Sequence, residues 1–258
     1  MRTGHRRRSG GFTLVELTTI LVIVALVVGG ILIGKDLYNA ARNRSIIKEL
    51  NSYQHAIALF NNKYSYYPGD LPNPQKYWPS ATWTYNSYPN GDRAVLWAEE
   101  GEYAWRELRL ANFVPEGIIT NNPHIEVSLL QRLHAYPGTS VPESAVIPKA
   151  GWTLAISKYL QANMLLFGRR PPSLLGIFPS MGAISATDTF YIDSKLDDGD
   201  PQLGNIRVVL GGGGHSPYDA TAGCVQADST SHSGYVYQNT NTANTLTLGC
   251  NFYGAVEF

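Results

Sequence analysis

Charged residues and cysteines are scarce in this chain. Asp, Glu, Lys and Arg make up 16% of its 258 residues, and only two residues are cysteines. Two cysteines exclude a miniprotein held together by several disulfides, and they exclude a four-cysteine zinc site. The hydrophobic content of 44% excludes disorder throughout, because such a chain can bury a core. At this length we expect one or two domains.

The chain also lacks a net charge, although its charges are unevenly spread. It has 20 Lys and Arg against 20 Asp and Glu, and four of the arginines lie in residues 1–11, which hold no acid. Residues 12–258 therefore carry 16 basic and 20 acidic side chains, a net charge of −4. Nucleic-acid binding depends on neutralising phosphates with Lys and Arg. We therefore expect no nucleic-acid partner.

Common catalytic motifs are missing as well. The sequence contains no HExxH, no GxSxG and no paired-histidine spacing. The glycine run at 211–214 lacks the lysine of a phosphate-binding loop and does not have the GxGxxG spacing, so it predicts a flexible loop. Nothing in the sequence indicates an enzyme, and we expect none.

One uncharged run near the N-terminus is long enough to cross a membrane. Residues 17–34 carry no charge, and with 12–15 the apolar segment reaches the roughly 20 residues that span a bilayer core. The arginines ahead of it would stay in the cytoplasm, which sends everything after Lys35 across the membrane. No A-x-A-like cleavage site follows the run, so we expect a retained single-pass anchor and not a secretory signal.

Glu16 is unexpected within this apolar segment. A carboxylate costs about 2.5–3.5 kcal/mol at the centre of a membrane helix on insertion scales. One interpretation is that Glu16 lies near the membrane interface and reaches the headgroups. The other is that it pairs with a cation: if the chain were cut between Gly11 and Phe12, the new amino group of a neighbouring copy would lie within reach of Glu16.

The N-terminus resembles the processing motif of type IV prepilins and type II secretion pseudopilins. The resemblance includes the arginines of the leader, the segment Gly11-Phe12-Thr13-Leu14-Val15-Glu16-Leu17 and the apolar run that follows it. The resemblance implies that a membrane aspartyl peptidase cuts between Gly11 and Phe12 and that Phe12 is then N-methylated. It also implies that Glu16 pairs with a neighbour's N-terminus during filament assembly. Many members of the family have a proline where this chain has Ile33.

The resemblance implies a structural subunit of a type IV pilus-like filament or a type II secretion pseudopilus. Such a subunit starts in the bacterial inner membrane with a periplasmic C-terminal domain and then enters the filament. Its partners would be the prepilin peptidase and N-methyltransferase, other pilin or pseudopilin subunits and an inner-membrane assembly platform.

Two alternatives stay open. The first is a component at the filament tip, such as a minor pilin that contacts DNA, a surface or secreted cargo; the size of the mature chain favours a minor or specialised subunit. The second is a membrane-anchored enzyme. The cleavage site and Glu16 favour a filament subunit over an enzyme, because an anchor needs neither.

The chain is expected to be α+β: a long N-terminal helix, transmembrane and then amphipathic, packed on a C-terminal domain with a small antiparallel sheet, as in type IV pilins. No proline occurs from Phe12 to Tyr67, and a helix over 12–64 would be about 80 Å long. Its outer half has apolar residues at spacings of three, four and seven. These are Leu37, Ala40, Ala41, Ile47, Leu50, Ile57 and Tyr64. The expected domains are a cleaved leader at 1–11, the membrane segment at 12–34, the outer half of the helix at 35–64 and a globular domain at 65–258.

The globular part is expected to mix helices and short strands. Prolines and aromatic residues predict a long structured loop at 65–92. Helices are predicted at 94–113, 125–134 and, from a capping box that starts at Ser185, at 185–196. Strands are predicted at 152–157, 164–167 and 205–210, with edge strands at 235–237 and 245–248.

Cys224 and Cys250 both lie on the exported side of the predicted anchor, where disulfides persist. Joining them would stabilise the fold by about 3.5 kcal/mol through loop entropy. The alternative is two buried free thiols. The family resemblance favours the disulfide, since many type IV pilins close a C-terminal loop in this way.

Four carboxylates, those of Asp193, Asp197, Asp198 and Asp200, gather around Gly199. Calcium takes six to eight oxygen ligands, several of them from carboxylates on a tight turn. The spacing is not that of an EF-hand, and a solvated acidic helix end is the competing interpretation. Major pseudopilins use calcium in a C-terminal loop, so the resemblance keeps a calcium site open as the one cofactor to test.

Overall fold

The computed structural model describes residues 13–81, 89–95, 99–119, 136–157, 162–169, 182–208, 224–227, 231–232, 235–237, 250 and 252–256. It divides the chain into two compact units, Met1–Arg42 and Asn43–Phe258. Helix α1 (Leu14–Tyr64) contributes its first part to one unit and its second part to the other. The expected domain limits after residues 11, 34 and 64 stay predictions.

The described part of the first unit consists of α1 alone. The helix runs without interruption through Gly29 and Gly30, which agrees with the absence of proline and with the predicted helix. Its apolar side chains are exposed: the exposed fraction is 81% at Leu14, 71% at Ile33 and 67% at Leu37. Leu37 therefore does not belong to a buried face, contrary to the periodicity prediction.

The second part of α1 carries the inner face of the domain. Ile46, Leu50, Ile57 and Phe60 are almost fully buried, at spacings of four, seven and three residues. The predicted face was partly wrong: Ile46 and Phe60 were not included in it, whereas Ile47 and Tyr64 are only partly buried at its border. Helical spacing alone does not show which of two adjacent apolar residues points at the sheet.

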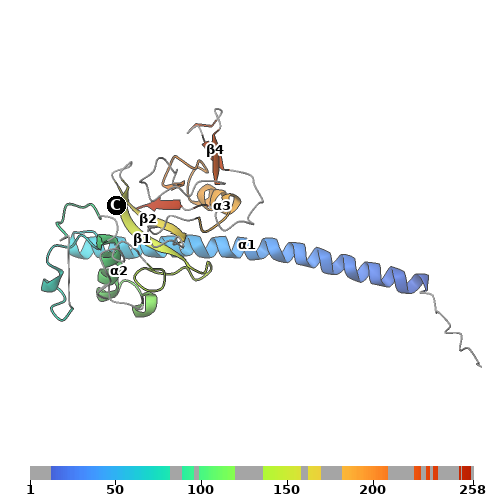
Figure 1. Cartoon of the computed structure of the whole chain (residues 1–258), viewed down its shortest axis with the longest axis horizontal. Helices are drawn as coiled ribbons and strands as arrows, with labels where there is room; N and C mark the ends of the chain where they lie inside the picture. Colours follow the sequence, from blue (N-terminus) through green and yellow to red (C-terminus); the bar gives the residue numbers. More distant parts are fainter. Residues whose placement is uncertain are drawn as a thin grey trace, which may run out of the picture. The chain divides into compact units, whose positions relative to one another are not determined.

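The domain is built on an antiparallel sheet of four strands in the order β1-β2-β6-β3. The strands are β1 (Ala150–Ser157), β2 (Ala162–Arg169), β6 (Phe252–Ala255) and β3 (Ile206–Val208). The two long strands lie side by side in Figure 1, paired over their full length from Ala150 with Arg169 to Ser157 with Ala162. The small antiparallel sheet was predicted, with β1 two residues longer at its start and β2 two residues longer at each end than expected. The short strand β6 was not predicted.

An aromatic row crosses three strands and forms the centre of the core. Trp152 pairs in register with Phe167, and Phe167 with Phe252. The ring centroids are 4.6 Å apart in the first pair and 5.4 Å in the second. Next to this row, a Cβ atom on Gly254 would lie 3.0 Å from Cδ1 of Leu50, so glycine is what lets α1 approach the sheet closely.

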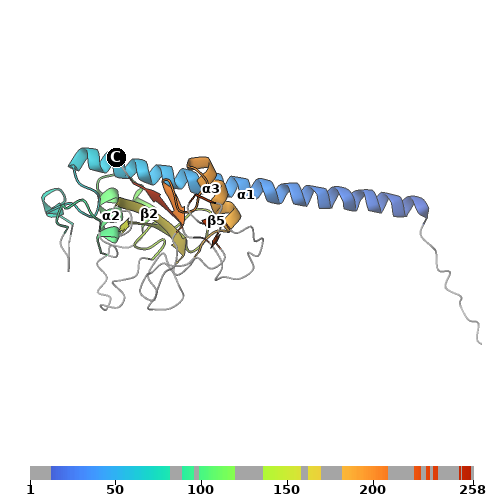
Figure 2. The ribbon, with the colours of Figure 1, turned by 90° about the horizontal axis from the view of Figure 1, so that it is seen from above.

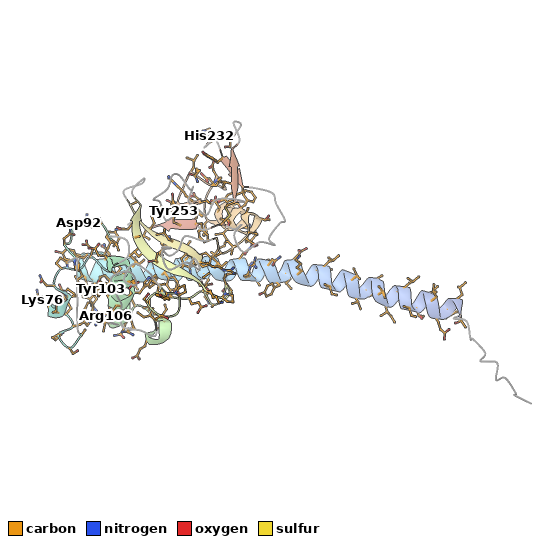
Figure 3. All side chains as sticks on the ribbon, in the orientation of Figure 1. Lys76, Asp92, Tyr103, Arg106, His232 and Tyr253 are labelled. Carbon is orange, nitrogen blue, oxygen red and sulfur yellow. A yellow bond between two sulfur atoms is a disulfide. The ribbon has the colours of Figure 1, made fainter. Side chains whose placement is uncertain are left out.

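Two further α-helices belong to the described part of the second unit. Helix α2 (Glu99–Leu110) packs against β1, and a Cβ atom on Gly101 would collide with the backbone oxygen of Leu154. Figure 3 labels Tyr103 and Arg106 on this helix. Helix α3 (Ala186–Leu196) begins with the predicted cap, because Oγ of Ser185 accepts a hydrogen bond of 3.1 Å from the Asp188 backbone. Two short 3₁₀ helices, Pro74–Lys76 and Glu116–Ile118, lie in the connections.

A small hairpin lies beside α3. It consists of β4 (Val225–Ala227) and β5 (Tyr235–Tyr237), an antiparallel pair, and Figure 2 shows β5 next to α3. Strand β5 was predicted, whereas β4 was not. The described parts of 65–92 hold no α-helix or strand, in agreement with the predicted loop. The predicted helix at 125–134, the glycine loop at 211–214 and the strand at 245–248 lie outside the described residues.

Candidate functional site

The N-terminal end of α1 is closed by a reciprocal pair of hydrogen bonds between Thr13 and Glu16. Oε2 of Glu16 accepts from the backbone nitrogen and from Oγ1 of Thr13, both at 2.8 Å. Oγ1 of Thr13 accepts in return from the Glu16 backbone nitrogen at 3.3 Å. This is a capping box, in which the first orphan amides of a helix find side-chain partners. Gly11 and Phe12 lie outside the described residues.

The capping box gives Glu16 a local role that the sequence analysis missed. The signal was present, since Thr13-Leu14-Val15-Glu16 has the T-x-x-E spacing of such a box. The cap places the Glu16 carboxylate at the helix start, where the helix dipole also favours a negative charge.

Beyond this cap, residues 17–34 of the first unit carry no charge and are exposed except for the partly buried Gly29. Among the described helices, α1 is the one long and apolar enough to cross a membrane by length and composition. No described side chain in its apolar window is buried. A long exposed apolar helix of this kind is compatible with a single-pass membrane anchor, because burial of apolar surface away from water is favourable at roughly 25 cal/mol per Å².

In the second unit, a disulfide joins Cys224 to Cys250, whose Cα atoms are 5.2 Å apart. Both residues are fully buried, and with Ala186 and Val208 they form a small apolar cluster of their own. Cys250 also pairs with Ile184 as an isolated bridge, just ahead of α3. The bond therefore ties the start of β4 to the segment before α3, in agreement with the expected pairing.

The carboxylates at the end of α3 converge only in part. One carboxylate oxygen each from Asp193, Asp197 and Asp198 lies within 4.8 Å of the others. Asp200, which was expected in the same group, is not part of it. Its Oδ1 instead accepts a hydrogen bond of 3.0 Å from the Gln202 backbone, which holds the side chain on its own turn.

All three converging carboxylates already have structural partners, and that of Asp198 is the Asp200 backbone nitrogen, which donates to its Oδ1 at 2.8 Å. Asp193 is fully buried, and its Oδ2 accepts a 2.8 Å hydrogen bond from the hydroxyl of Tyr237. Burial raises the pKa of Asp193 to about 7. Oδ2 of Asp197 accepts hydrogen bonds from the backbone of Asn205 and of Ile206, which holds the start of β3. The donor set suits a hard cation such as calcium, but each of these carboxylates also has a role in closing the local fold.

Buried acids elsewhere in the domain were not found by sequence reasoning. Asp70 accepts hydrogen bonds of 2.7 Å from the backbones of Gly91 and Arg93, and so joins the two ends of the structured loop at 65–92. Glu107, on α2, accepts a 2.6 Å hydrogen bond from Gly69, while its Oε1 atom is buried with no hydrogen-bond partner. Burial raises the pKa of the Glu107 carboxyl well above its usual range. No sequence spacing marks these residues, because only tertiary contacts bury them.

Comparison with protein-family models, with curated proteins and with solved structures finds no match for this chain.

Proposed function

We propose that this chain is a structural subunit of a type IV pilus-like filament or a type II secretion pseudopilus. In this proposal it is cleaved between Gly11 and Phe12, methylated at Phe12 and assembled through its N-terminal helix. The observation that carries the proposal is the exposed apolar helix of the first unit with one acid, Glu16, in its first turn. It starts in the inner membrane with the second unit in the periplasm.

The apolar helix supports the proposal because it needs an apolar environment on every side. Its exposed residues point around the whole circumference and not along one stripe, as Leu26, Val27 and Leu32 illustrate: they are 72%, 56% and 61% exposed and point in three different directions around the helix axis. A lipid bilayer provides such an environment before assembly. Helices of neighbouring subunits would provide it within a filament. A surface helix that packs on one partner would show apolar residues on one face only.

The position of Glu16 supports assembly beyond simple anchoring. Its hydrogen bonds with Thr13 satisfy backbone and hydroxyl groups, and none of the described residues supplies a countercharge to the carboxylate. The N-terminal amine of a neighbouring processed copy would supply a positive charge at the same depth in the membrane as Glu16. A charge at that depth is costly without a partner. Pairing would therefore favour one axial register between subunits over the others.

The experiment separates the charge of Glu16 from its capping role. Glu16→Gln keeps the T-x-x-Q form of the capping box and removes the charge, whereas Glu16→Ala removes both. Thr13→Val is the matched control, because it removes the capping hydroxyl and leaves the charge. We expect both Glu16 variants to insert in the membrane normally and to enter filaments at a small fraction of the wild-type level. Thr13→Val should assemble nearly as well as wild type.

The outcome that contradicts the proposed role of Glu16 is equally definite. If Glu16→Gln assembles normally while Thr13→Val does not, the residue acts as a helix cap and not as a pairing charge. Processing is tested separately by mass spectrometry of the N-terminus. A methylated Phe12 is expected in cells with the prepilin peptidase, and the leader should persist in a strain without it. An intact leader in both strains would remove the basis for the filament assignment.

A further inference from the structure

A groove of about 660 Å³ opens between the C-terminal end of α3 and the β4–β5 hairpin. Its wall combines three aromatic rings with two carboxylates and one histidine. These residues are Phe190, Tyr235, Tyr237, Asp198, Asp200 and His232. Figure 2 shows α3 and β5 side by side at this place, and Figure 3 labels His232 at the hairpin. The volume is within the range of about 300–1,000 Å³ typical of ligand sites.

The aromatic rings of the groove are accessible to a partner. Phe190 is 48% exposed and Tyr235 is 36% exposed, although both are large side chains that usually bury most of their surface. The rings of Phe190 and Tyr237 meet edge to face, with centroids 5.7 Å apart. This contact fixes the orientation of Phe190 and leaves about half of its surface facing solvent. The rings of Phe190 and Tyr237 therefore form a preorganised platform.

Among the described residues that line the groove, the two with a formal charge are both acids. Asp198 and Asp200 line it, and the buried Asp193 lies behind it, bonded to the Tyr237 hydroxyl. None of the described lining residues is a lysine or an arginine.

We propose that this groove binds a lysine or arginine side chain of a partner protein. Aromatic faces carry a negative quadrupole that attracts a cation, and carboxylates beside them add to the attraction. An arginine is favoured over a lysine, because its planar guanidinium stacks on a ring and donates to a carboxylate at the same time. An anionic ligand is disfavoured by the carboxylates. The groove is larger than a single side chain, so residues on either side of the basic one also enter it.

The proposal does not depend on the filament assignment, since it rests only on groups of the second unit. It does share Asp198 with the carboxylate cluster at the end of α3. A divalent cation on that cluster would neutralise part of the negative field that attracts the basic side chain. The binding measurement is therefore made in chelator, where the carboxylates are free of metal, and repeated in millimolar calcium.

The test uses the full chain in zwitterionic detergent and three acetylated, amidated peptides that differ at one position: Gly-Ser-Arg-Ser-Gly and its Lys and Gln counterparts. Binding is followed by NMR of the peptide. We expect the Arg peptide to bind about tenfold more tightly than the Gln peptide, with the Lys peptide between them. Asp198→Asn and Phe190→Leu should each lower affinity for the Arg peptide about three- to tenfold. Glu116→Gln, which removes an exposed acid from a 3₁₀ helix outside the groove, should leave it unchanged.

Each alternative result overturns the proposal. Equal affinity for the Arg and Gln peptides would show that charge does not select the ligand. Equal loss of binding in Glu116→Gln and Asp198→Asn would show a non-specific effect of net charge. Retention of binding in both Phe190→Leu and Asp198→Asn would place the peptide elsewhere. Thermal melting of each variant, and its intact disulfide, establish that the Asn and Leu substitutions leave the domain folded.

Discussion

Glu49, on α1, accepts a hydrogen bond of 2.9 Å at Oε2 from the indole nitrogen of Trp152, in the edge strand β1. Its other oxygen, Oε1, accepts from Oγ of Ser144 at 3.2 Å and from the backbone of Ala145 at 3.0 Å. One carboxylate on the outer half of the helix thus holds both the edge of the sheet and the segment that precedes it. Trp152 in turn begins the aromatic row of the core.

The first prediction concerns this carboxylate. Glu49→Ala should lower the free energy of unfolding of the second unit by about 2–3 kcal/mol, because it leaves the buried indole N–H without an acceptor and removes two further hydrogen bonds. Urea denaturation of the full chain in detergent, followed by tryptophan fluorescence, measures the loss. Lys48→Ala, at the exposed neighbouring position, is the control and should change the stability by less than about 0.5 kcal/mol. Equal stability of the two variants would contradict the role of Glu49.

The second prediction concerns pH and Glu107. Burial raises the pKa of this carboxyl in the folded state, so the folded state holds its proton at pH values at which the unfolded chain releases it. The contribution of Glu107 to stability is then fully present below the unfolded value of about 4.5 and is lost as pH rises through the folded pKa. Glu107→Gln keeps an oxygen acceptor for the Gly69 amide and cannot ionise.

The test of this second prediction is the difference in stability between wild type and Glu107→Gln as a function of pH. The variant should gain on the wild type steadily as pH rises above about 4.5. Taking the difference removes the contribution of acids that do not interact with Glu107, such as Asp193. The charge of Asp70 acts on Glu107 and is part of the measured effect. Glu107→Ala should be destabilised at every pH, since it leaves a cavity and an amide without a partner. A difference that does not vary with pH would show that Glu107 is ionised in the folded protein.

The third prediction concerns the disulfide. Mass spectrometry of the exported protein under non-reducing conditions should yield a peptide that links Cys224 to Cys250. Replacing both cysteines by serine should destabilise the domain by about 2–5 kcal/mol, because the bond closes a loop of sequence separation 26 and both residues are buried. Alkylation of both thiols without prior reduction would refute the pairing.

The fourth prediction concerns calcium at the end of α3, where we propose Asp193, Asp197 and Asp198 as ligands. Binding to the folded state stabilises it by about 2.7 kcal/mol at a hundredfold excess over Kd. The full chain in detergent should therefore melt about 5–10 °C higher in millimolar calcium than in chelator. Asp198→Ala should abolish this shift. Asp200→Asn should preserve it, because Asp200 does not belong to the converging group. Identical melting with and without calcium would leave these carboxylates as purely structural groups.

Local features of the sequence determined the long helix and its cap. The absence of proline up to Tyr67 predicts a continuous helix, and the uncharged run at 17–34 predicts that its first part is long enough to span a bilayer. Both properties depend only on local composition. The caps at Ser185 and at Thr13 depend on side chains three residues apart, so both can be read directly, although the second was overlooked. The strands predicted at 152–157 and 164–167 fall within β1 and β2, whereas the full length of eight residues follows from the pairing of the two strands.

Only the tertiary structure decided how the rest is used. The four residues of β6 become a strand by pairing with β2 on one side and β3 on the other. Tertiary packing also decides that Ile46 is buried more fully than Ile47, and that three of the four acids near Gly199 converge while Asp200 does not. Burial of Glu107 and the bonds of Glu49 depend on elements 38 to 103 residues apart. A sequence states which groups carry charge, but the dielectric and the partners that set their energy exist only once distant segments have packed together.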